Sequence, residues 1–525
     1  MDTPETPLRP EGEGLHRLEA QRRLNREAVR ALGHEPYGVR TDDITDARDA
    51  RATFDERAND EFNAKGKEPG YVDQRPTARV AGRVMLLRDN GKLIWMTLRD
   101  HTGDIQVAVS QRDCDAPGFG VAKATDLGDV VIADGRVMKT KTGEVTVWAT
   151  AVRPASKALL PPPAKHEGLQ DIEIRYRQRY VDLWANPQTL GVFRLRCGIV
   201  SRVRRFMEGR GYLEVETPML QTLAGGAAAR PFATHMNALD IPLFLRIAPE
   251  LYLKRLLVGG FPRVFEVNRN FRNEGLDKQH NPEFTMLEAY HAYGDVETVM
   301  ELTESLIRDA ATFVARQEAP ETPPTGVLPF GDLRIDYSKP FARVRYGDLF
   351  ERAWGFSMRD EARVRATAEK VFSAEKVRGA DHWMLVNELF EEKGEKLVDP
   401  SVPTFITEYP AAVSPLTRPK RDDPALADRA DLFIGGMEIA PHYTELNDPD
   451  VQEAKFREQL RGTDTDKSAE ERTFRTFDDD FVRALKVGMP PAGGMGLGID
   501  RLVMLLTNQP TIRDVMLFPM MRPEE

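Results

Sequence analysis

Alternating hydrophobic and polar positions mark residues 77–153 as a region of short β-strands. Turn residues such as Asp89-Asn90-Gly91 separate the alternating stretches, as expected for strands joined by tight turns. We predict five strands, over residues 77–87, 92–100, 103–110, 129–140 and 143–153. Five short strands in so short a stretch predict a small barrel, and the five-stranded oligonucleotide-binding (OB) fold is the leading candidate.

The residues before this region favour a helix rather than strands. Residues 15–32 carry a helical pattern that places Arg22, Arg23, Arg26 and Arg30 on one face. Such a face is either solvated or in contact with an RNA backbone, and the sequence leaves both interpretations open. The first fourteen residues are rich in Pro, Gly and Glu, a composition typical of disorder.

The second half of the chain has a different pattern. A helical period runs through residues 192–211, and strand patterns then recur without a βαβ rhythm, which predicts an α+β unit. The segment 175–183 interleaves Arg and Tyr, and it suits either RNA contact or docking between domains. We expect a tail and helical extension over 1–76, an OB fold over 77–157, a linker over 158–185 and a large domain over 186–525, of which 342–400 is a mainly helical insertion.

One predicted strand of the large domain carries an unexpected charge. In residues 283–290, Glu288 shares a face with Phe284, Met286 and Tyr290, while the opposite face is also poor in polar groups. A buried carboxylate is costly unless a cation pairs with it. The partner of Glu288 is therefore either a structural Arg or Lys, or a ligand.

Composition narrows the class of protein. The 525 residues include only two cysteines, Cys114 and Cys197, too few for a disulfide framework or a zinc site of their own. The sequence shows neither a signal peptide nor an apolar run long enough to span a membrane, so we expect a cytoplasmic protein without membrane contact. A net charge of −10 argues against generic nucleic-acid binding, so any RNA contact must use local patches.

Three segments of the predicted large domain carry motifs that follow one another in a defined order along the chain. GYLEVETPML (211–220), FRNEG followed by HNPEF (271–284), and GMGLGIDRL (494–502) resemble the three signature motifs of class II aminoacyl-tRNA synthetases. These motifs and the segments APELYLKR, FITEYPAAVSPL and TELND together resemble the lysine-specific branch of that family. The resemblance covers roughly residues 75–525. The resemblance implies a catalytic domain built on an antiparallel sheet and a homodimer. It also implies ATP and L-lysine as substrates, Mg²⁺ as cofactor, and tRNA(Lys) as partner.

The motif residues suit the chemistry of carboxylate activation. In-line attack on the α-phosphate of ATP needs positioning and positive charge, which the planar cations Arg272 and Arg501 supply. The resemblance assigns catalysis to these two arginines. It also implies an ATP site built from Arg272, Glu274, His280, Asn281, Phe284 and Arg501.

A metal site is expected at the hairpin DLFIGGMEIA. If Gly435-Gly436 form its turn, Ile434 faces Met437, Phe433 faces Glu438, and Asp431 becomes a diagonal neighbour of Glu438. Two carboxylates at that spacing suit a Mg²⁺ that carries phosphates, and the resemblance implies the same ligands. Two solvated carboxylates are the alternative.

The resemblance also answers the question of Glu288. It implies that Glu288 and Glu445 accept the ε-ammonium of lysine and that Glu250 holds the α-ammonium. The full lysine site implied is Gly226, Glu250, Arg272, Glu288, Tyr290, Tyr443 and Glu445. Aspartate- or asparagine-specific members of the class would need a cationic or amide-reading pocket instead.

One residue departs from the family pattern, and one further site follows from it. Where the family usually has an asparagine, this chain has Pro441, which offers neither an amide nor a backbone N–H, and we assign no role to it. In the barrel, Trp95, Gln106 and Glu144 fall where the family reads the anticodon, and a core position is the alternative for Trp95. The alternatives are a ligase that attaches lysine to a protein and a non-catalytic RNA-binding relative.

Overall fold

The computed structural model describes residues 13–163, 169–227, 229–318, 325–460 and 478–524. The chain divides into two compact units, the first ending at Gln170 and the second beginning at Asp171. The expected disorder of residues 1–14 falls largely outside the described residues. No helix among the described residues is both long enough and apolar enough to cross a membrane.

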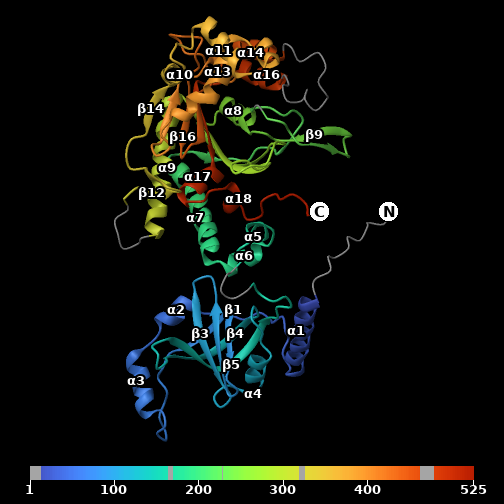
Figure 1. Cartoon of the computed structure of the whole chain (residues 1–525), viewed down its shortest axis with the longest axis vertical. Helices are drawn as coiled ribbons and strands as arrows, with labels where there is room; N and C mark the ends of the chain where they lie inside the picture. The colour runs from blue at the N-terminus through green and yellow to red at the C-terminus, as the bar shows by residue number, and fades with distance from the viewer. Residues whose placement is uncertain (1–12, 164–168, 228, 319–324, 461–477, 525) are drawn as a thin grey trace. The chain divides into compact units, whose positions relative to one another are not determined.

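The first unit is built around a closed barrel of five strands (Figure 1). Alternate residues of each strand point inward, and Ile94, Met96 and Leu98 of one strand meet Val107 of the next in a hydrophobic core. The strand order is β1-β2-β3-β5-β4. The strands are β1 (Thr77–Asp89), β2 (Leu93–Arg99), β3 (Asp104–Ser110), β4 (Val130–Lys139) and β5 (Val145–Ser156). The predicted OB-type barrel is confirmed.

Four helices accompany the barrel: α1 (Glu13–Ala31), α2 (Ala47–Ala52), α3 (Glu56–Lys65) and α4 (Ala116–Lys123). On α1, Arg22 is buried and donates hydrogen bonds of 2.9 Å to the carbonyl oxygens of Leu127 and Ala158. Arg22 therefore anchors the helix within its unit and does not belong to an exposed basic face. Arg23 and Arg30 pair with glutamates of the same helix.

The second unit is organised by an eight-stranded sheet in the order β14-β15-β16-β17-β18-β11-β10-β6. All neighbouring strands run antiparallel except the two edge pairs, β14 with β15 and β10 with β6. The strands are β6 (Leu213–Glu214), β10 (Arg263–Phe271), β11 (Glu283–Ala292), β14 (Ala342–Arg345), β15 (Thr404–Thr407), β16 (Arg429–Ile434), β17 (Met437–Thr444) and β18 (Ala492–Gly498). The predicted antiparallel architecture is confirmed.

Helices cover one face of this sheet. The helices α7 (Pro187–Gly209), α9 (Val296–Glu318) and α17 (Ile499–Leu506) share one hydrophobic core with the strands, to which β11 contributes Leu287 and Ala289 (Figure 1). Because successive strand residues point to opposite faces, Glu288 must point away from this core. The opposite face is the one that carries the charged residues of the motifs.

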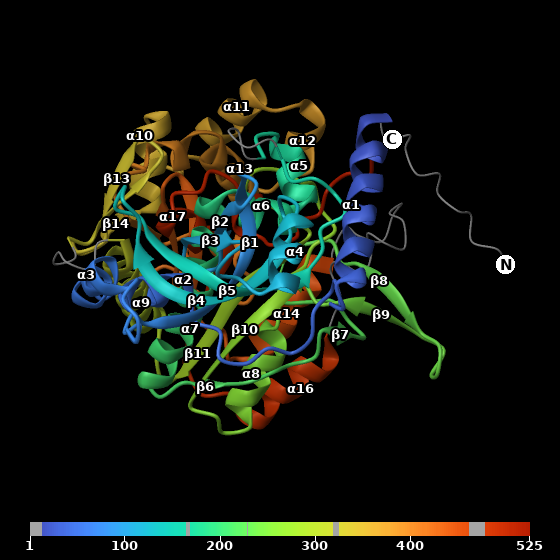
Figure 2. The same cartoon turned by 90° about the horizontal axis from the view of Figure 1, so that it is seen from below.

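Residues 346–397 are mainly helical and pack in a second hydrophobic core, to which Ile406 of β15 and Phe433 of β16 also contribute. They comprise α10 (Tyr346–Trp354), α11 (Glu361–Val371), α12 (Ala374–Arg378), α13 (His382–Leu389), η1 (Phe390–Gly394) and η2 (Glu395–Leu397). Helices α8 (Glu250–Val258), α14 (Pro449–Leu460) and α16 (Asp479–Gly488) pack at the other end of the sheet, where α8 contacts β10, β11 and α16. A separate hairpin of β8 (Ala233–Met236) and β9 (Ile241–Leu245), to which β7 (Leu220–Gln221) adds a third strand, extends from the second unit in both views (Figure 2).

The interleaved Arg and Tyr residues lie at the start of the second unit, in α5 (Ile172–Arg177) and α6 (Arg179–Ala185). Tyr176 donates a 2.9 Å hydrogen bond to Asp514, near α18 (Ile512–Val515). The buried Arg179 pairs with Asp182 at 2.6 Å and donates to the carbonyl oxygen of Arg513. Tyr176 and Arg179 thus hold these helices against the C-terminal segment.

Candidate active site on the large sheet

Glycines leave the centre of the charged face open. Gly496 of β18 lies opposite Glu288, and Gly494 lies between Tyr290 of β11 and Tyr443 of β17. A Cβ atom at position 494 would come within 1.9 Å of the Glu445 carboxylate and 2.6 Å of the Tyr290 ring. The glycine-rich third motif is therefore a sheet strand whose missing side chains leave room for the acidic residues.

Glu288 is buried without a cation. Its exposed fraction is 5%, and its hydrogen-bond partner is the Tyr290 hydroxyl, at 3.4 Å. Within the described residues Glu288 forms no ion pair, whereas its cross-strand neighbour Glu266 is paired with Arg246 at 2.7 Å. Burial, and next the charge of Glu250, raise the pKa of Glu288 well above its usual value. A structural salt bridge, the alternative considered from the sequence, is not formed.

Glu445 differs from Glu288, because a lysine of the chain already contacts it. Lys254 on α8 is fully buried, its Nζ lies 2.6 Å from Glu250, and it forms a second ion pair with Glu445. Burial opposes the charge of Lys254, but the two glutamates outweigh it, and its pKa is raised. Burial raises the pKa of Glu445 to about 7, although Lys254 works in the opposite direction.

The sequence analysis missed Lys254. Its signal was present, because Lys254 falls on the apolar stripe of α8 with Leu251 and Leu257 and stands one helical turn after Glu250. A lysine on an apolar stripe with a glutamate four residues before it indicates a buried ion pair. The pattern did not reveal the second glutamate, which lies 191 positions further along the chain.

The predicted lysine-site residues lie together in the fold. Tyr290, which is buried, is close enough to Glu250, Glu288, Glu445 and Tyr443 for their charges to raise its pKa, although burial is the larger cause. Gly226 has a φ of +86°, and a Cβ there would come within 3.0 Å of the Glu250 Cβ. Strand β11, the end of β17 and the start of α8 thus bring these side chains into one buried acidic cluster, which we call the acidic pocket.

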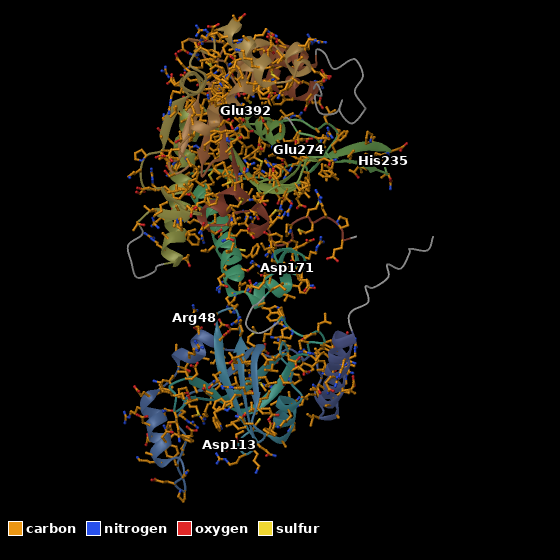
Figure 3. The ribbon with its side chains drawn as sticks, in the orientation of Figure 1. Arg48, Asp113, Asp171, His235, Glu274 and Glu392 are labelled. Carbon is orange, nitrogen blue, oxygen red and sulfur yellow. The ribbon has the colours of Figure 1, made fainter. Side chains whose placement is uncertain are left out.

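Arg272 follows β10 and lies beside this pocket. Its guanidinium carbon is 5.0 Å from the centre of the Phe284 ring, and its backbone N–H donates to the carbonyl of Pro282 at 2.8 Å. Burial lowers the pKa of Arg272, and the charges of Glu274, Glu288 and Glu438 partly offset that effect. Glu274 itself is exposed in the loop after β10 (Figure 3).

Arg501 lies in the first turn of α17 and contacts one residue of the predicted metal site and one residue of the predicted ATP site. It donates a 2.6 Å hydrogen bond to the carbonyl oxygen of Glu438 and a 2.9 Å bond to Nε2 of His280. Because Nε2 accepts, the His280 proton is on Nδ1, which donates to Asp277 at 2.7 Å. The buried Asn281 donates to the carbonyl of Glu283 at 2.6 Å.

The predicted hairpin forms between β16 and β17, with one irregularity. Gly435 and Gly436 both have positive φ, Ile434 faces Met437 and Phe433 faces Glu438, as predicted. A bulge after Leu432 then places Asp431 opposite Pro441. The buried Asp431 carboxylate is bound by both arms of Arg429, at 3.0 and 2.6 Å, a partner that the sequence analysis did not identify.

Negative potential nevertheless accumulates at this hairpin. The pKa of Glu438 is raised, because the surrounding protein desolvates its carboxyl and because Asp431 lies nearby. Burial and the charges of Glu391, Glu438 and Asp431 raise the pKa of Glu395 to about 7. A cation bound here would relieve this repulsion.

In the barrel, the predicted anticodon residues lie on its outer surface or at its rim. Trp95 is half-buried between strand positions that point inward, and its ring packs edge-on against Trp148, with 6.4 Å between centres. Gln106 accepts a 2.8 Å hydrogen bond from Thr146, and Glu144 is exposed in the turn before β5. Trp95 therefore does not belong to the barrel core.

Comparison with known proteins gives two family matches. Residues 171–522 match the model of class II tRNA synthetases (D, K and N), and residues 78–155 match that of the OB-fold nucleic acid binding domain. The chain is 44% identical to the lysine–tRNA ligase of Pelotomaculum thermopropionicum over 98% of this chain and 96% of that protein. It is 44% identical to the ligase of the same name from Magnetococcus marinus, over 96% and 97%, and 47% identical to that of Ectopseudomonas mendocina, over 88% and 89%.

Proposed function

This chain belongs to the lysine–tRNA ligases among the class II tRNA synthetases, and from that premise we propose how its cleft selects and activates lysine. The enzyme is a ligase that forms aminoacyl-tRNA. The observation that carries the proposal is the buried carboxylate of Glu288, which forms no ion pair with any described residue. A carboxylate in that state favours a ligand that brings its own positive charge.

The acidic pocket recognises the two ammonium groups of L-lysine. Glu288 accepts the ε-ammonium together with Tyr290 and Glu445, while Tyr443 lines the pocket. Glu250, with the backbone of Gly226, holds the α-ammonium. A substrate without the terminal ammonium leaves buried carboxylates unpaired, which is the basis of specificity; the general argument has been worked out on other tRNA synthetases.

In the first step, a carboxylate oxygen of lysine attacks the α-phosphorus of ATP. The new carboxyl–phosphate bond forms as the bond to pyrophosphate breaks, giving lysyl-adenylate and pyrophosphate. Arg272 holds the attacking carboxylate and the α-phosphate, and Arg501 neutralises the leaving phosphates from the opposite side. Phe284 stacks on the adenine, with Glu274, His280 and Asn281 completing the ATP site.

In the second step, the 3′-terminal hydroxyl of tRNA(Lys) attacks the lysyl carbonyl carbon. The ester bond forms, AMP leaves with the bonding electron pair, and the hydroxyl proton is released. The barrel binds the anticodon through stacking on Trp95 and base-edge contacts from Gln106 and Glu144. We place this reaction in the cytoplasm.

Magnesium fits the hairpin between β16 and β17. Glu438 is an exposed residue of β17, and Asp431 offers oxygens that it would share with Arg429. A bound Mg²⁺ neutralises phosphate charge during the transfer of the adenylyl group. Glu438→Gln should therefore raise the Mg²⁺ concentration needed for half-maximal exchange, and an unchanged requirement would exclude Glu438 as a ligand.

The homodimer implied by the family resemblance is also part of the proposal. The first motif contributes the exposed apolar residues Leu213, Met219 and Leu220, and the β8–β9 hairpin contributes Met236 and Leu239. Exposed apolar groups concentrated in this way favour an interface. Sedimentation at micromolar concentration should give the mass of two chains, and a monomer at all concentrations would refute the assignment.

The decisive test of the proposed function is ATP–pyrophosphate exchange with each of the twenty amino acids. We expect exchange with lysine alone, followed by transfer of lysine to tRNA(Lys) but not to other tRNAs. Exchange that depends on another amino acid would refute the pocket assignment. Exchange with lysine but without transfer to tRNA would instead indicate ligation to a different acceptor.

A further inference from the structure

Lys254 is the one positive side chain that enters the acidic pocket from helix α8. It is fully buried, and its ammonium contacts both Glu250, at 2.6 Å, and Glu445. The proposed reaction gives Lys254 no chemical step. An ammonium placed between two of the three pocket glutamates nonetheless changes what the pocket can bind.

We infer that Lys254 is a positioning residue for substrate selection, a built-in cation that fixes Glu250 and Glu445 and matches the charge of the pocket to that of lysine. This inference rests on the proposed function, because it concerns how the same pocket recognises its substrate.

The charge balance of the pocket supports this role. The three carboxylates of Glu250, Glu288 and Glu445 face the two cations Lys254 and Arg272, so one negative charge is left over when all five groups are ionised. Lysine carries two ammonium groups and one carboxylate, so its net positive charge closes the balance. Without Lys254 the loaded pocket would keep an unpaired buried carboxylate, which is costly.

Geometry supports the same conclusion. Glu250 opens α8 and Glu445 follows β17, so the two carboxylates come from separate elements and would repel one another without a cation between them. The stem of Lys254 lies in the apolar layer between α8 and the sheet, where Leu253 and Leu257 are also buried. The helix thus delivers a fixed ammonium, and each glutamate keeps its second oxygen for the substrate.

Titration separates this role from a purely structural one. Besides Lys254, the ionisable groups close enough to interact with Glu445 are Glu250 from α8 and Tyr290 from β11. Only Lys254 lowers the pKa of Glu445. Its removal should therefore shift the protonation of Glu445 to higher pH and weaken lysine binding near neutral pH.

The test is a kinetic comparison of Lys254→Met, Lys254→Arg and the wild type in ATP–pyrophosphate exchange from pH 6 to pH 9. For Lys254→Met we expect the KM for lysine at pH 7 to rise at least about tenfold, as when one partner of a buried pair is removed. We expect the KM for ATP to stay within about twofold, and the pH midpoint of lysine binding to move up by about one unit or more. Lys254→Arg should keep the wild-type midpoint.

Lys157→Met is the matched control. Lys157 is equally buried in the barrel unit, where it pairs with Asp126 and Asp129 at 2.5 and 2.7 Å. Its replacement should lower thermal stability to a similar extent but leave the KM for lysine and the pH midpoint unchanged.

The inference is overturned if Lys254→Met loses stability as Lys157→Met does while the lysine KM and the midpoint stay at wild-type values. If Lys254→Met does not fold, Lys254→Arg is the variant that tests the inference, because its larger, planar guanidinium group must displace the two carboxylates. An unchanged lysine KM in Lys254→Arg would then refute the role. Failure of the proposed function is a separate result, since it would appear as absence of lysine-dependent exchange in the wild type.

Discussion

Replacing Glu288 with glutamine removes one negative charge from the acidic pocket while keeping the shape of the side chain. We expect the KM for lysine to rise strongly and the KM for ATP to change little, because Arg272, Phe284 and Arg501 remain in place. The same substitution should make the empty protein more stable. Active-site substitutions that only damage packing would instead make the empty protein less stable.

The magnitude follows from the surroundings of Glu288. The side chain is 5% exposed, and among the described residues its one hydrogen-bond partner is the Tyr290 hydroxyl, at 3.4 Å, so the substrate ammonium would be its main partner. Losing a buried charged partner costs about 2–5 kcal/mol, and glutamine keeps an acceptor oxygen, so we take about 2–3 kcal/mol. This corresponds to a roughly 30- to 150-fold fall in kcat/KM for lysine.

The stability change has a definite pH dependence. The pKa of Glu288 is raised in the folded protein, so the folded state retains a proton that the unfolded state releases above pH 4.5. Stability from this group is therefore present at low pH and is lost as the pH rises. The advantage of Glu288→Gln in melting temperature should grow from pH 5 to pH 8.

Two measurements check this reasoning: steady-state exchange at varied lysine and ATP, and thermal unfolding across the same pH range. An unchanged KM for lysine would refute the assignment of Glu288 to the ammonium. A melting temperature that falls equally at every pH would refute the view that its carboxylate is unpaired in the empty pocket.

Three further predictions concern other parts of the molecule. The KM for lysine should fall as the pH rises from 6 to 8, because burial raises the pKa of Glu445 to about 7 and only its ionised form accepts an ammonium; calorimetry in buffers of different ionisation enthalpy should detect proton release on binding. Gly494→Ala should abolish lysine-dependent exchange, since its Cβ would lie 1.9 Å from the Glu445 carboxylate, whereas Gly191→Ala, with no atom within 4 Å of the added Cβ, should keep wild-type exchange. Trp95→Ala should raise the KM for tRNA by about 10- to 100-fold, the value of one base stack, and leave exchange without tRNA unchanged; an equal loss in both assays would indicate damage to the barrel.

The local pattern of apolar, polar and turn residues was enough to predict the strands and the turn on which the site residues lie. The strand with Glu288 was predicted as one buried on both faces, because neither face of the segment is rich in polar residues. The Gly435-Gly436 turn was predicted because paired glycines suit a two-residue hairpin. The five strands of the barrel were predicted from alternation and turn residues in the same way.

Long-range pairing could not be predicted by the same means. Arg429 stands two residues from Asp431 on the same strand, yet nothing in that spacing indicates that its guanidinium folds onto the neighbouring carboxylate. The bulge after Leu432 likewise depends on how β16 meets β17 and is not visible in either strand alone. Helical spacing placed Arg22 on one face with three other arginines. In the structure its side chain is buried instead, because it donates hydrogen bonds to the carbonyl oxygens of Leu127 and Ala158.

The sequence by itself determined the types of element, the order of the motifs and the family of the chain, because these depend on residue types at short, regular spacings. Only the tertiary structure decided which buried charges are paired: Glu266 with Arg246, Glu445 with Lys254, and Glu288 with neither. The physical reason is that the free energy of a buried charge depends on groups within a few ångströms, and the fold draws those groups from distant positions in the chain.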